Sequence, residues 1–273
     1  MDQPPRARQS SRSGADDGNA PRHAAEYRPH TGGVTALDRE AALRLLELGE
    51  LTVQGRIVAA SNATFQGSVR DGDVTATCVY KPVRGERPLE DFPDGTLWKR
   101  ERAAYLVSEA SGWEIVPPTV MRDHGPFGEG MAQLWIDVDE SVDIWKLVNE
   151  PDARLRRIAL FDAAVNNADR KGGHLLPAPG GHLYGVDHGI CLAAEPKLRT
   201  ILWDWRGDPI APDELDVLRS LRVKLDGPLC QALQRLLGPA EMRALNARVD
   251  RLIRTKVFPQ PDPYRMAVPW PPW

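Results

Sequence analysis

The hydrophobic pattern changes character near the middle of the chain, and this change constrains the fold more than any other feature of the sequence. In the first half, segments such as VTATCVYKP (residues 74–82) alternate in the manner of half-buried strands. In the second half, apolar residues recur at helical spacing, as in 152–167 and 212–256. The pattern predicts an α+β protein with a β-rich part and then a helical part. Small molecules commonly bind in the cleft between two such parts.

We expect roughly five strands and one long helix in the first half, after a short amphipathic helix within 35–50. The long helix is predicted within 95–113, with Asp94 as a possible N-cap. The Asp-Gly-Asp sequence at 71–73 predicts a hairpin turn, and Pro82 should end the strand that follows it. The predicted strands lie at 51–60, 63–69, 74–82 and in a hairpin over 119–137. For the second half we predict helices at 141–148 and 152–167, a short strand at 183–186, and two or three helices in 212–256.

The two ends of the chain differ from its centre in composition. Residues 1–33 contain few aliphatic side chains and many Pro, Gly, Ser and Arg, so they bury too little apolar area to offset the entropy of ordering, and we expect disorder. Residues 259–273 form a Pro-rich, extended tail, in which Trp270 and Trp273 are expected to dock on the domain.

Charge and cysteine content limit the classes of partner and compartment. The net charge of −3 gives no global basic field, so nucleic acid is not expected as a partner. The three cysteines are widely spaced, which suits a reducing compartment, and no apolar run approaches the roughly twenty residues of a membrane span. Together with the absence of an apolar signal segment, these features predict a cytoplasmic protein.

Two positions in the β-rich part are candidates for binding phosphate. Lys81 ends the alternating strand 74–82, and Glu101 lies on the long predicted helix. A strand lysine held by a helix glutamate is how protein kinases fix an ammonium group against nucleotide phosphates. Ser61 and Asn62 link the first two predicted strands, where backbone N–H groups and short polar side chains can cover phosphates.

Two aspartates in the second half occupy loop positions beside a short strand. Asp169 follows the helix predicted over 152–167, and Asp187 follows the strand 183–186. Loop carboxylates placed in this way can meet a substrate hydroxyl and a divalent cation, respectively. Mg²⁺ is held by one or two carboxylates together with phosphate oxygens and water, which agrees with so small a ligand set.

Other chemistries fit the sequence less well. No GxxxxGK[ST] sequence occurs, which excludes a P-loop NTPase, and no GxSxG sequence suggests acyl transfer. The glycines of GPFGEG (125–130) fall inside a hairpin and are read as turn residues. A zinc site is not supported, because the spacing of the remaining candidates matches no familiar ligand pattern; these are His174, His182, His188 and Cys191.

The order of these segments resembles a known family. NNADRKGGHLL followed by YGVDHGICL is similar to the catalytic and metal-binding loops of the phosphatidylinositol 3- and 4-kinase superfamily, in particular its small actinobacterial branch. CVYKP resembles that superfamily's phosphate-binding lysine strand, and SNATF resembles its short, glycine-poor phosphate loop. The resemblance covers roughly residues 50–210 and fits the C-terminal helices more loosely.

The resemblance implies a bilobal protein-kinase-like fold, with a β-rich N-lobe containing one key helix and a mainly helical C-lobe. It implies ATP and Mg²⁺ or Mn²⁺ as cofactors, with Lys81 on the nucleotide phosphates and Glu101 orienting Lys81. Asp169 would be the catalytic base or orient the acceptor, and Asp187 would be the main metal ligand. Adenine would meet the hinge formed by Gln133, Trp135 and Ile136.

One position departs from the family pattern. His174 stands where the family has a metal-binding asparagine, five residues after the catalytic aspartate. A neutral imidazole can ligate a divalent cation, but Mg²⁺ prefers oxygen ligands. The departure leaves three possibilities open, namely metal binding mainly by Asp187, a preference for Mn²⁺, or weakened catalysis.

The expected function is therefore an ATP-dependent phosphotransferase whose acceptor is a protein or small-molecule hydroxyl. The segment after Asp187 mixes acidic with basic residues, whereas an inositol phosphate would favour a denser basic cluster. The alternative is a nucleotide-binding pseudokinase or regulatory scaffold. The expected boundaries are 1–33 for the disordered tail, 34–136 for the N-lobe, 137–258 for the C-lobe and 259–273 for the Pro/Trp-rich tail.

Overall fold

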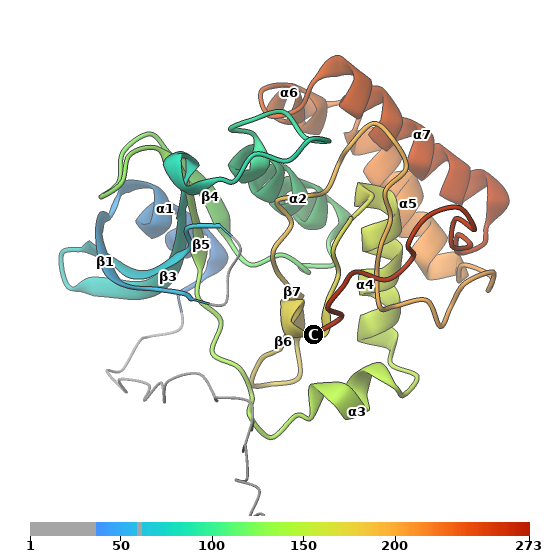
Figure 1. Ribbon diagram of the computed structural model, residues 1–273, viewed down its shortest axis with the longest axis horizontal. Helices are drawn as coiled ribbons and strands as arrows, with labels where there is room; N and C mark the ends of the chain where they lie inside the picture. Colours follow the sequence, from blue (N-terminus) through green and yellow to red (C-terminus); the bar gives the residue numbers. More distant parts are fainter. Residues whose placement is uncertain (1–36, 59–61) are drawn as a thin grey trace, which may run out of the picture. The chain divides into compact units, whose positions relative to one another are not determined.

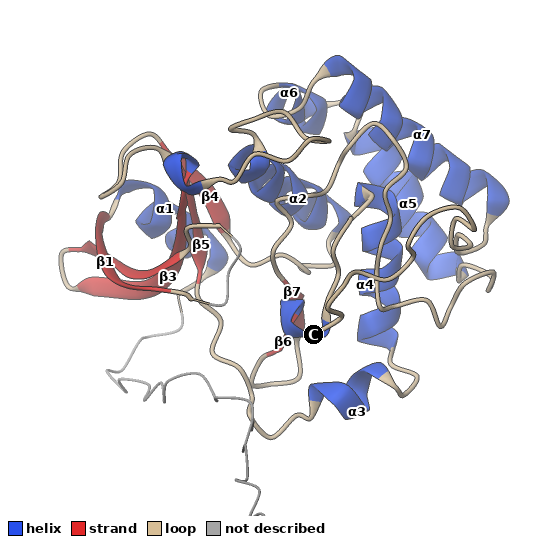
Figure 2. Cartoon of the chain, in the orientation of Figure 1, coloured by secondary structure: helices blue, strands red, loops and turns tan. Residues whose placement is uncertain are grey.

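The computed structural model describes residues 37–58 and 62–273. Within these residues, an antiparallel sheet lies at one side and most of the helices lie at the other (Figures 1 and 2). The predicted order of a β-rich part followed by a helical part is therefore correct. The predicted tail 1–33 and the phosphate-loop residue Ser61 lie outside the described residues.

The sheet has five antiparallel strands in the order β1-β2-β3-β5-β4. Alternation along β3 buries Ala76, Cys78 and Tyr80 on one face, where they pack with side chains of the first helix. Lys81 therefore belongs to the opposite face, because successive side chains of a strand point to opposite sides. The strands are β1 (Glu50–Arg56), β2 (Phe65–Asp71), β3 (Val74–Pro82), β4 (Thr119–Arg122) and β5 (Gly130–Leu134).

The hairpin between β2 and β3 has the predicted turn. Asp71 pairs with Val74 across Gly72 and Asp73, and Gly72 has a φ of 58°. A left-handed φ at this position is readily adopted only by glycine and a few polar residues, which explains why the sequence has glycine here.

Two helices accompany the sheet. Helix α1 (Arg39–Leu48) begins at the N-cap Asp38, whose side chain accepts a hydrogen bond from the N–H of Ala41. Helix α2 (Leu97–Ser111) is not capped by Asp94, as the sequence suggested. Instead, the carboxylate of Glu86 accepts hydrogen bonds from the N–H groups of Leu97 and Trp98 at 3.1 and 2.8 Å. Because this cap comes from eleven residues upstream, local helix signals could not identify it.

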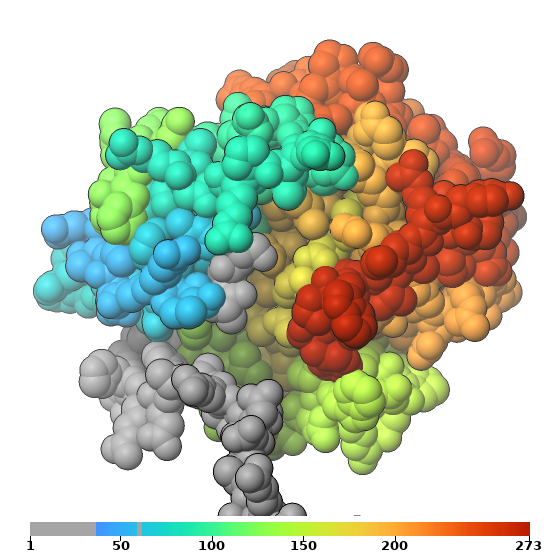
Figure 3. Space-filling view, in the orientation of Figure 1, coloured from blue at the N-terminus to red at the C-terminus, as the bar shows by residue number. Residues whose placement is uncertain are grey.

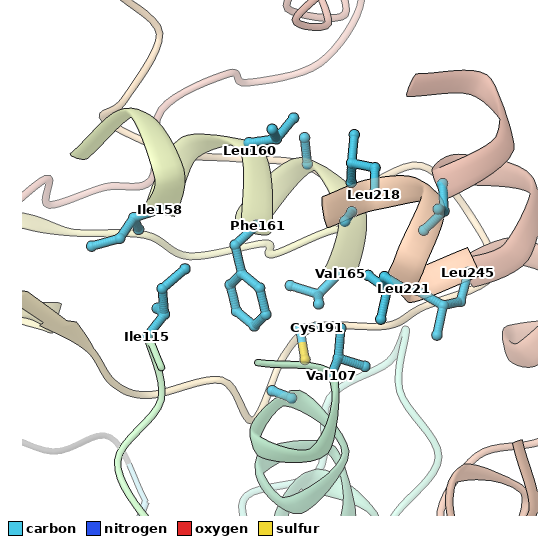
Figure 4. Packing of buried hydrophobic residues seen from close by; sticks show 14 of the residues in the cluster. Val107, Ile115, Ile158, Leu160, Phe161, Val165, Cys191, Leu218, Leu221 and Leu245 are labelled. Carbon is cyan, nitrogen blue, oxygen red and sulfur yellow. The ribbon is translucent and has the colours of Figure 1, made fainter. Parts of the chain in front are cut away.

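The second half is mainly helical, and its helices surround the larger hydrophobic core. Phe161 and Val165 of α4 point toward Val107 of α2 and toward Cys191 in this core (Figure 4). The sequence did not predict the short strand Leu175–Pro177, which precedes the strand predicted at 183–186. The elements are α3 (Ile144–Val148), α4 (Ala153–Val165), β6 (Leu175–Pro177), β7 (Leu183–Gly185), α5 (Pro212–Lys224), α6 (Pro228–Gln234) and α7 (Pro239–Thr255). No helix in the described part of the chain combines the length and apolarity needed to cross a membrane.

The C-terminal tail docks through only one of the two tryptophans expected to hold it. The ring of Trp273 lies 5.0 Å from that of Trp145 and directly over Gly172, whose N–H donates to the carbonyl of Pro272 at 2.9 Å. Trp270 is 81% exposed, so it does not dock on the described residues as predicted.

We predict that Glu86→Ala destabilises the fold, because it leaves two N–H groups at the start of α2 without an acceptor. The expected loss in the free energy of unfolding is about 1–2 kcal/mol, measured by urea denaturation. Glu90→Ala is the matched control, since Glu90 is exposed nearby and its side chain forms no hydrogen bond with the residues that the structure describes. Equal stability of the two variants would contradict the assigned capping role.

Candidate active site

Lys81 is held between two carboxylates that come from distant parts of the chain. Its Nζ lies 2.6 Å from Oε1 of Glu101 on α2 and 2.7 Å from Oδ1 of Asp187 after β7. Burial lowers the pKa of Lys81, but the charges of Asp187 and Glu101 more than offset this, so its pKa lies above the ordinary value. The structure thus brings together three of the residues singled out in the sequence, and the lysine remains charged at neutral pH.

Glu101 also joins α2 to the loop that carries Asp187. Its side chain is buried, and Oε2 accepts a hydrogen bond of 2.9 Å from the N–H of His188. One carboxylate therefore orients Lys81 with one oxygen and fixes the backbone next to Asp187 with the other. A shift of α2 would disturb both contacts together.

A fully buried arginine, Arg170, follows the candidate catalytic residue Asp169. Its guanidinium forms two hydrogen bonds of 2.9 Å with the carboxylate of Asp162 on α4. It also donates to the carbonyls of His174 and Val186 at 3.3 and 3.0 Å. Arg170 therefore ties the candidate catalytic loop, the strand before Asp187 and α4 to one another.

Burial and the contact with Arg170 together set the protonation state of His188. Nη2 of Arg170 lies 2.6 Å from Nε2 of His188, and arginine can only donate, so Nε2 is the acceptor. Burial and the charge of Arg170 hold the pKa of His188 well below its ordinary value. His188 is neutral and carries its proton on Nδ1, which is buried and has no hydrogen-bond partner in the described part of the chain.

The backbone of Asp169 is fixed by its neighbours. Its N–H donates to Oδ1 of Asn167 at 3.0 Å, and Nδ2 of Asn167 donates to Asp162 at 2.9 Å. The carboxylate of Asp169 lies 3.2 Å from Nζ of Lys171 and is partly exposed. The carboxylate of Asp169 is thus accessible to solvent, while hydrogen bonds hold its backbone in place.

Asp187 and His174 form the candidate metal pair. Nε2 of His174 lies 3.4 Å from Oδ2 of Asp187, whose side chain is half exposed and whose φ is 61°. The charge of Lys81 holds the pKa of Asp187 well below its ordinary value. Burial lowers the pKa of His174 despite the opposing charge of Asp187, so the imidazole is neutral at pH 7.

This pair has the right donors for a divalent cation whose remaining ligands come from a nucleotide. It offers one ionised carboxylate and one neutral imidazole, and Nδ1 of His174 is buried without a hydrogen-bond partner among the described residues. No group of three or more His, Cys, Asp or Glu side chains is arranged to hold a metal ion within residues 37–58 and 62–273. A cation here would therefore depend on phosphate oxygens and water, as Mg²⁺ sites in nucleotide-binding proteins do.

The remaining residues singled out in the sequence lie near the sheet. Oδ1 of Asn62 accepts the N–H of Arg87 at 2.9 Å, which fixes the phosphate-loop candidate to the turn after β3. The buried Gln133 side chain donates to Thr119 at 2.8 Å, and Gln133 pairs with Val79, so it shares the face of β3 that carries Lys81. The N–H of Trp135 donates to the carbonyl of Thr77 at 3.0 Å, and half-buried Ile136 follows it.

Sequence reasoning missed the residues that position the site. Asp162, Arg170 and His188 are all buried and mutually connected, but none was selected as functional. One signal was present, because Asp162 is a carboxylate within the apolar run IALFDAAV, and a buried carboxylate requires a partner. The sequence alone did not identify that partner as Arg170.

The chain is similar in sequence to known proteins. No protein-family model matches it. Protein Rv2133c of Mycobacterium tuberculosis (strain ATCC 25618 / H37Rv) is 45% identical over 273 residues, covering 87% of this chain and 97% of the relative. Phosphatidylinositol 4-kinase gamma 4 of Oryza sativa subsp. japonica is 27% identical over 216 residues, covering 65% of this chain but only 38% of the rice protein.

Solved structures establish the fold class. The Golgi casein kinase crystallised with Mn/ADP bound has a TM-score of 0.54 and 15% identity, and the likeness covers 79% of this chain and 74% of that one. Hydra Fam20 with sugar has a TM-score of 0.52 and 14% identity, covering 81% and 91%. These likenesses confirm the expected kinase-like fold. They do not distinguish the phosphatidylinositol 3- and 4-kinase branch from other kinase-like proteins.

We predict that the protein loses stability as the pH falls below about 6.5, the ordinary pKa of histidine. His188 and His174 resist protonation when folded but take up protons freely when unfolded, so acid favours the unfolded chain. The free energy of unfolding should fall by up to about 1.4 kcal/mol per pH unit for each histidine, measured by urea denaturation from pH 7.5 to 5.5.

His188→Gln should flatten this pH dependence, because it removes one of the two groups. His124→Gln is the control, since His124 is exposed. If His188→Gln and His124→Gln change the pH dependence of the free energy of unfolding equally, the role given to His188 in this dependence is wrong.

Proposed function

This chain belongs to the family of Protein Rv2133c, and we propose that it is a phosphotransferase that uses ATP and a divalent cation to phosphorylate a hydroxyl group. The observation that supports this most strongly is the placement of Lys81 between Glu101 and Asp187, beside the loop of Asp169. In this proposal the site lies between a β-rich N-lobe, 34–136, and a helical C-lobe, 137–258, because small molecules commonly bind in the cleft between two such parts.

In this proposal each residue has a separate task. Lys81 binds phosphate oxygens of ATP while Glu101 keeps its ammonium group in place. Asp187 and His174 hold the cation, which would neutralise charge on the phosphates when bound. Asn62 lies at the phosphate loop, and the chain from Gln133 to Ile136 meets the adenine.

Asp169 is the proposed acceptor-orienting group. Its carboxylate is partly exposed and its backbone is fixed by Asn167, so it can accept a hydrogen bond from a substrate hydroxyl at a defined position. Transfer itself then depends mainly on positioning and on charge stabilisation by Lys81. The acceptor is proposed to be a protein or small-molecule hydroxyl.

A second candidate function is nucleotide binding without transfer, as in a pseudokinase or scaffold. The observation in its favour is His174, a nitrogen ligand where Mg²⁺ favours oxygen. The two functions differ in turnover and share nucleotide binding, so binding and transfer are tested separately below.

We predict that ATP raises the melting temperature of the protein in the presence of Mg²⁺ or Mn²⁺, because a ligand that binds only the native state stabilises it. At a concentration of about one hundred times Kd the stabilisation should reach about 2.7 kcal/mol. Asp187→Ala should remove the metal-dependent part of the shift, whereas the control Asp73→Ala, on the exposed β2–β3 turn, should retain it. An equal metal-dependent shift in both variants would rule out Asp187 as the main metal ligand.

We further predict that Asp169→Ala abolishes phosphate transfer and leaves the ATP-induced melting shift nearly intact, since Asp169 is assigned to the acceptor. Transfer is measured as loss of ATP with a panel of protein and small-molecule hydroxyl acceptors, after an acceptor has been found with the unmodified protein. Transfer that persists in Asp169→Ala would show that this assignment is wrong. Nucleotide binding without transfer to any acceptor would favour the pseudokinase.

A further inference from the structure

A cavity of about 680 Å³ lies apart from the residues of the candidate active site. Its walls come from the loop after α4, the segment 194–203, helix α7 and the tail 259–267. Lys81, Glu101, Asp169, His174 and Asp187 are not among the described residues that line it. Its volume lies in the range of small-molecule sites. Figure 3 shows the tail, in red, lying on the surface beside the yellow and gold parts of the chain.

The cavity walls carry an excess of positive charge. Lys197 is paired with Asp91 at 2.5 Å, and Arg265 lies 3.6 Å from Asp262. Three further arginines line the cavity and form no ion pair with a described residue, namely Arg199, Arg248 and Arg251. An excess of positive charge on a concave wall attracts anions.

Two of these arginines are held in place by backbone carbonyls. Nε and Nη1 of Arg248 donate to the carbonyls of Ala164 and Ala193 at 2.9 and 3.0 Å, while Nη2 is buried and no described residue accepts a hydrogen bond from it. Burial lowers the pKa of Arg248 to about 10. Nε of Arg199 donates to the carbonyl of Ala168 at 2.7 Å, and its two Nη groups form no hydrogen bond with a described residue. A buried guanidinium N–H without an acceptor is costly.

We propose that this cavity binds a small organic anion through a phosphate or carboxylate group held by Arg199, Arg248 and Arg251. Guanidinium groups bind both kinds of anion with paired N–H donors, which favours arginine over lysine at such a site. Trp203 and Met266 also line the cavity and offer apolar surface to the carbon skeleton of the ligand.

The cavity adjoins the back of the loop that carries Asp169. The N–H of Arg199 donates to the carbonyl of Asn167 at 2.9 Å, and the N–H of Arg170 donates to the carbonyl of Arg199 at 3.1 Å. An anion bound here therefore rests against the same backbone that positions the candidate catalytic aspartate. The binding site itself is independent of the proposed phosphotransferase activity.

The test is isothermal titration of the full chain with inorganic phosphate, pyrophosphate and citrate at constant ionic strength. The first two probes report on phosphate and the third on carboxylate. Arg251→Gln removes an exposed cationic group of the cavity, and Ala247→Glu places a carboxylate on its wall. Arg243→Gln is the matched control, because Arg243 is an exposed arginine of the same helix that does not line the cavity.

The expected result is saturable binding of at least one probe, weakened about tenfold by Arg251→Gln and abolished by Ala247→Glu. Arg243→Gln should leave the affinity unchanged. The proposal is overturned if no probe binds saturably, if binding survives in Ala247→Glu, or if Arg243→Gln weakens binding as much as Arg251→Gln does.

Discussion

The candidate site depends on the buried ion pair between Arg170 and Asp162. Neither side chain has measurable exposure, and breaking such a pair by removing one partner costs about 3–5 kcal/mol, because a charge is left buried alone. Arg170 lies next to Asp169 in the chain and also binds the carbonyls of His174 and Val186. The pair therefore fixes the loop of Asp169 and the approach to Asp187 against α4 at the same time.

From this pair, polar contacts continue across the protein to the sheet. Arg170 contacts His188, the N–H of His188 donates to Glu101, and Glu101 binds Lys81 on β3. Four separate segments of the chain are connected in this way, so the geometry of the site follows from the fold as a whole. Within that frame, Lys81 and Asp187 neutralise each other. A nucleotide with its cation offers each of them a new partner of opposite charge, so binding can exchange one set of ion pairs for another without leaving either group buried and unpaired.

Local patterns in the sequence predicted the parts of this site that depend on local structure. The alternating pattern predicted that Lys81 ends a strand, and Lys81 lies near the end of β3; the loop positions of Asp169 and Asp187 followed from the helix and strand beside them. The contact of Lys81 with Glu101 was expected from analogy with protein kinases, and the structure places the two atoms 2.6 Å apart.

The parts that sequence reasoning missed are long-range contacts. Glu86, in the turn after β3, caps the start of α2. Arg170 forms an ion pair with Asp162 on α4. Trp273, the last residue of the sequence, packs over Gly172. Each contact depends on how separate helices, strands and loops pack against one another. The spacing of apolar residues and the presence of turn-forming residues describe local structure and do not predict such packing. The same limit explains why the cavity beside α7 was not expected, since its arginines come from segments about fifty residues apart.

A crystal structure of the protein with a non-hydrolysable ATP analogue and Mn²⁺ would test directly whether nucleotide and cation bind at this site. We predict that Nζ of Lys81 keeps its contact with Glu101, moves away from Asp187 and contacts a phosphate oxygen. Asp187 and His174 should ligate the cation. A nucleotide bound elsewhere, or one bound here with Lys81 still paired to Asp187 and no cation on that carboxylate, would contradict it.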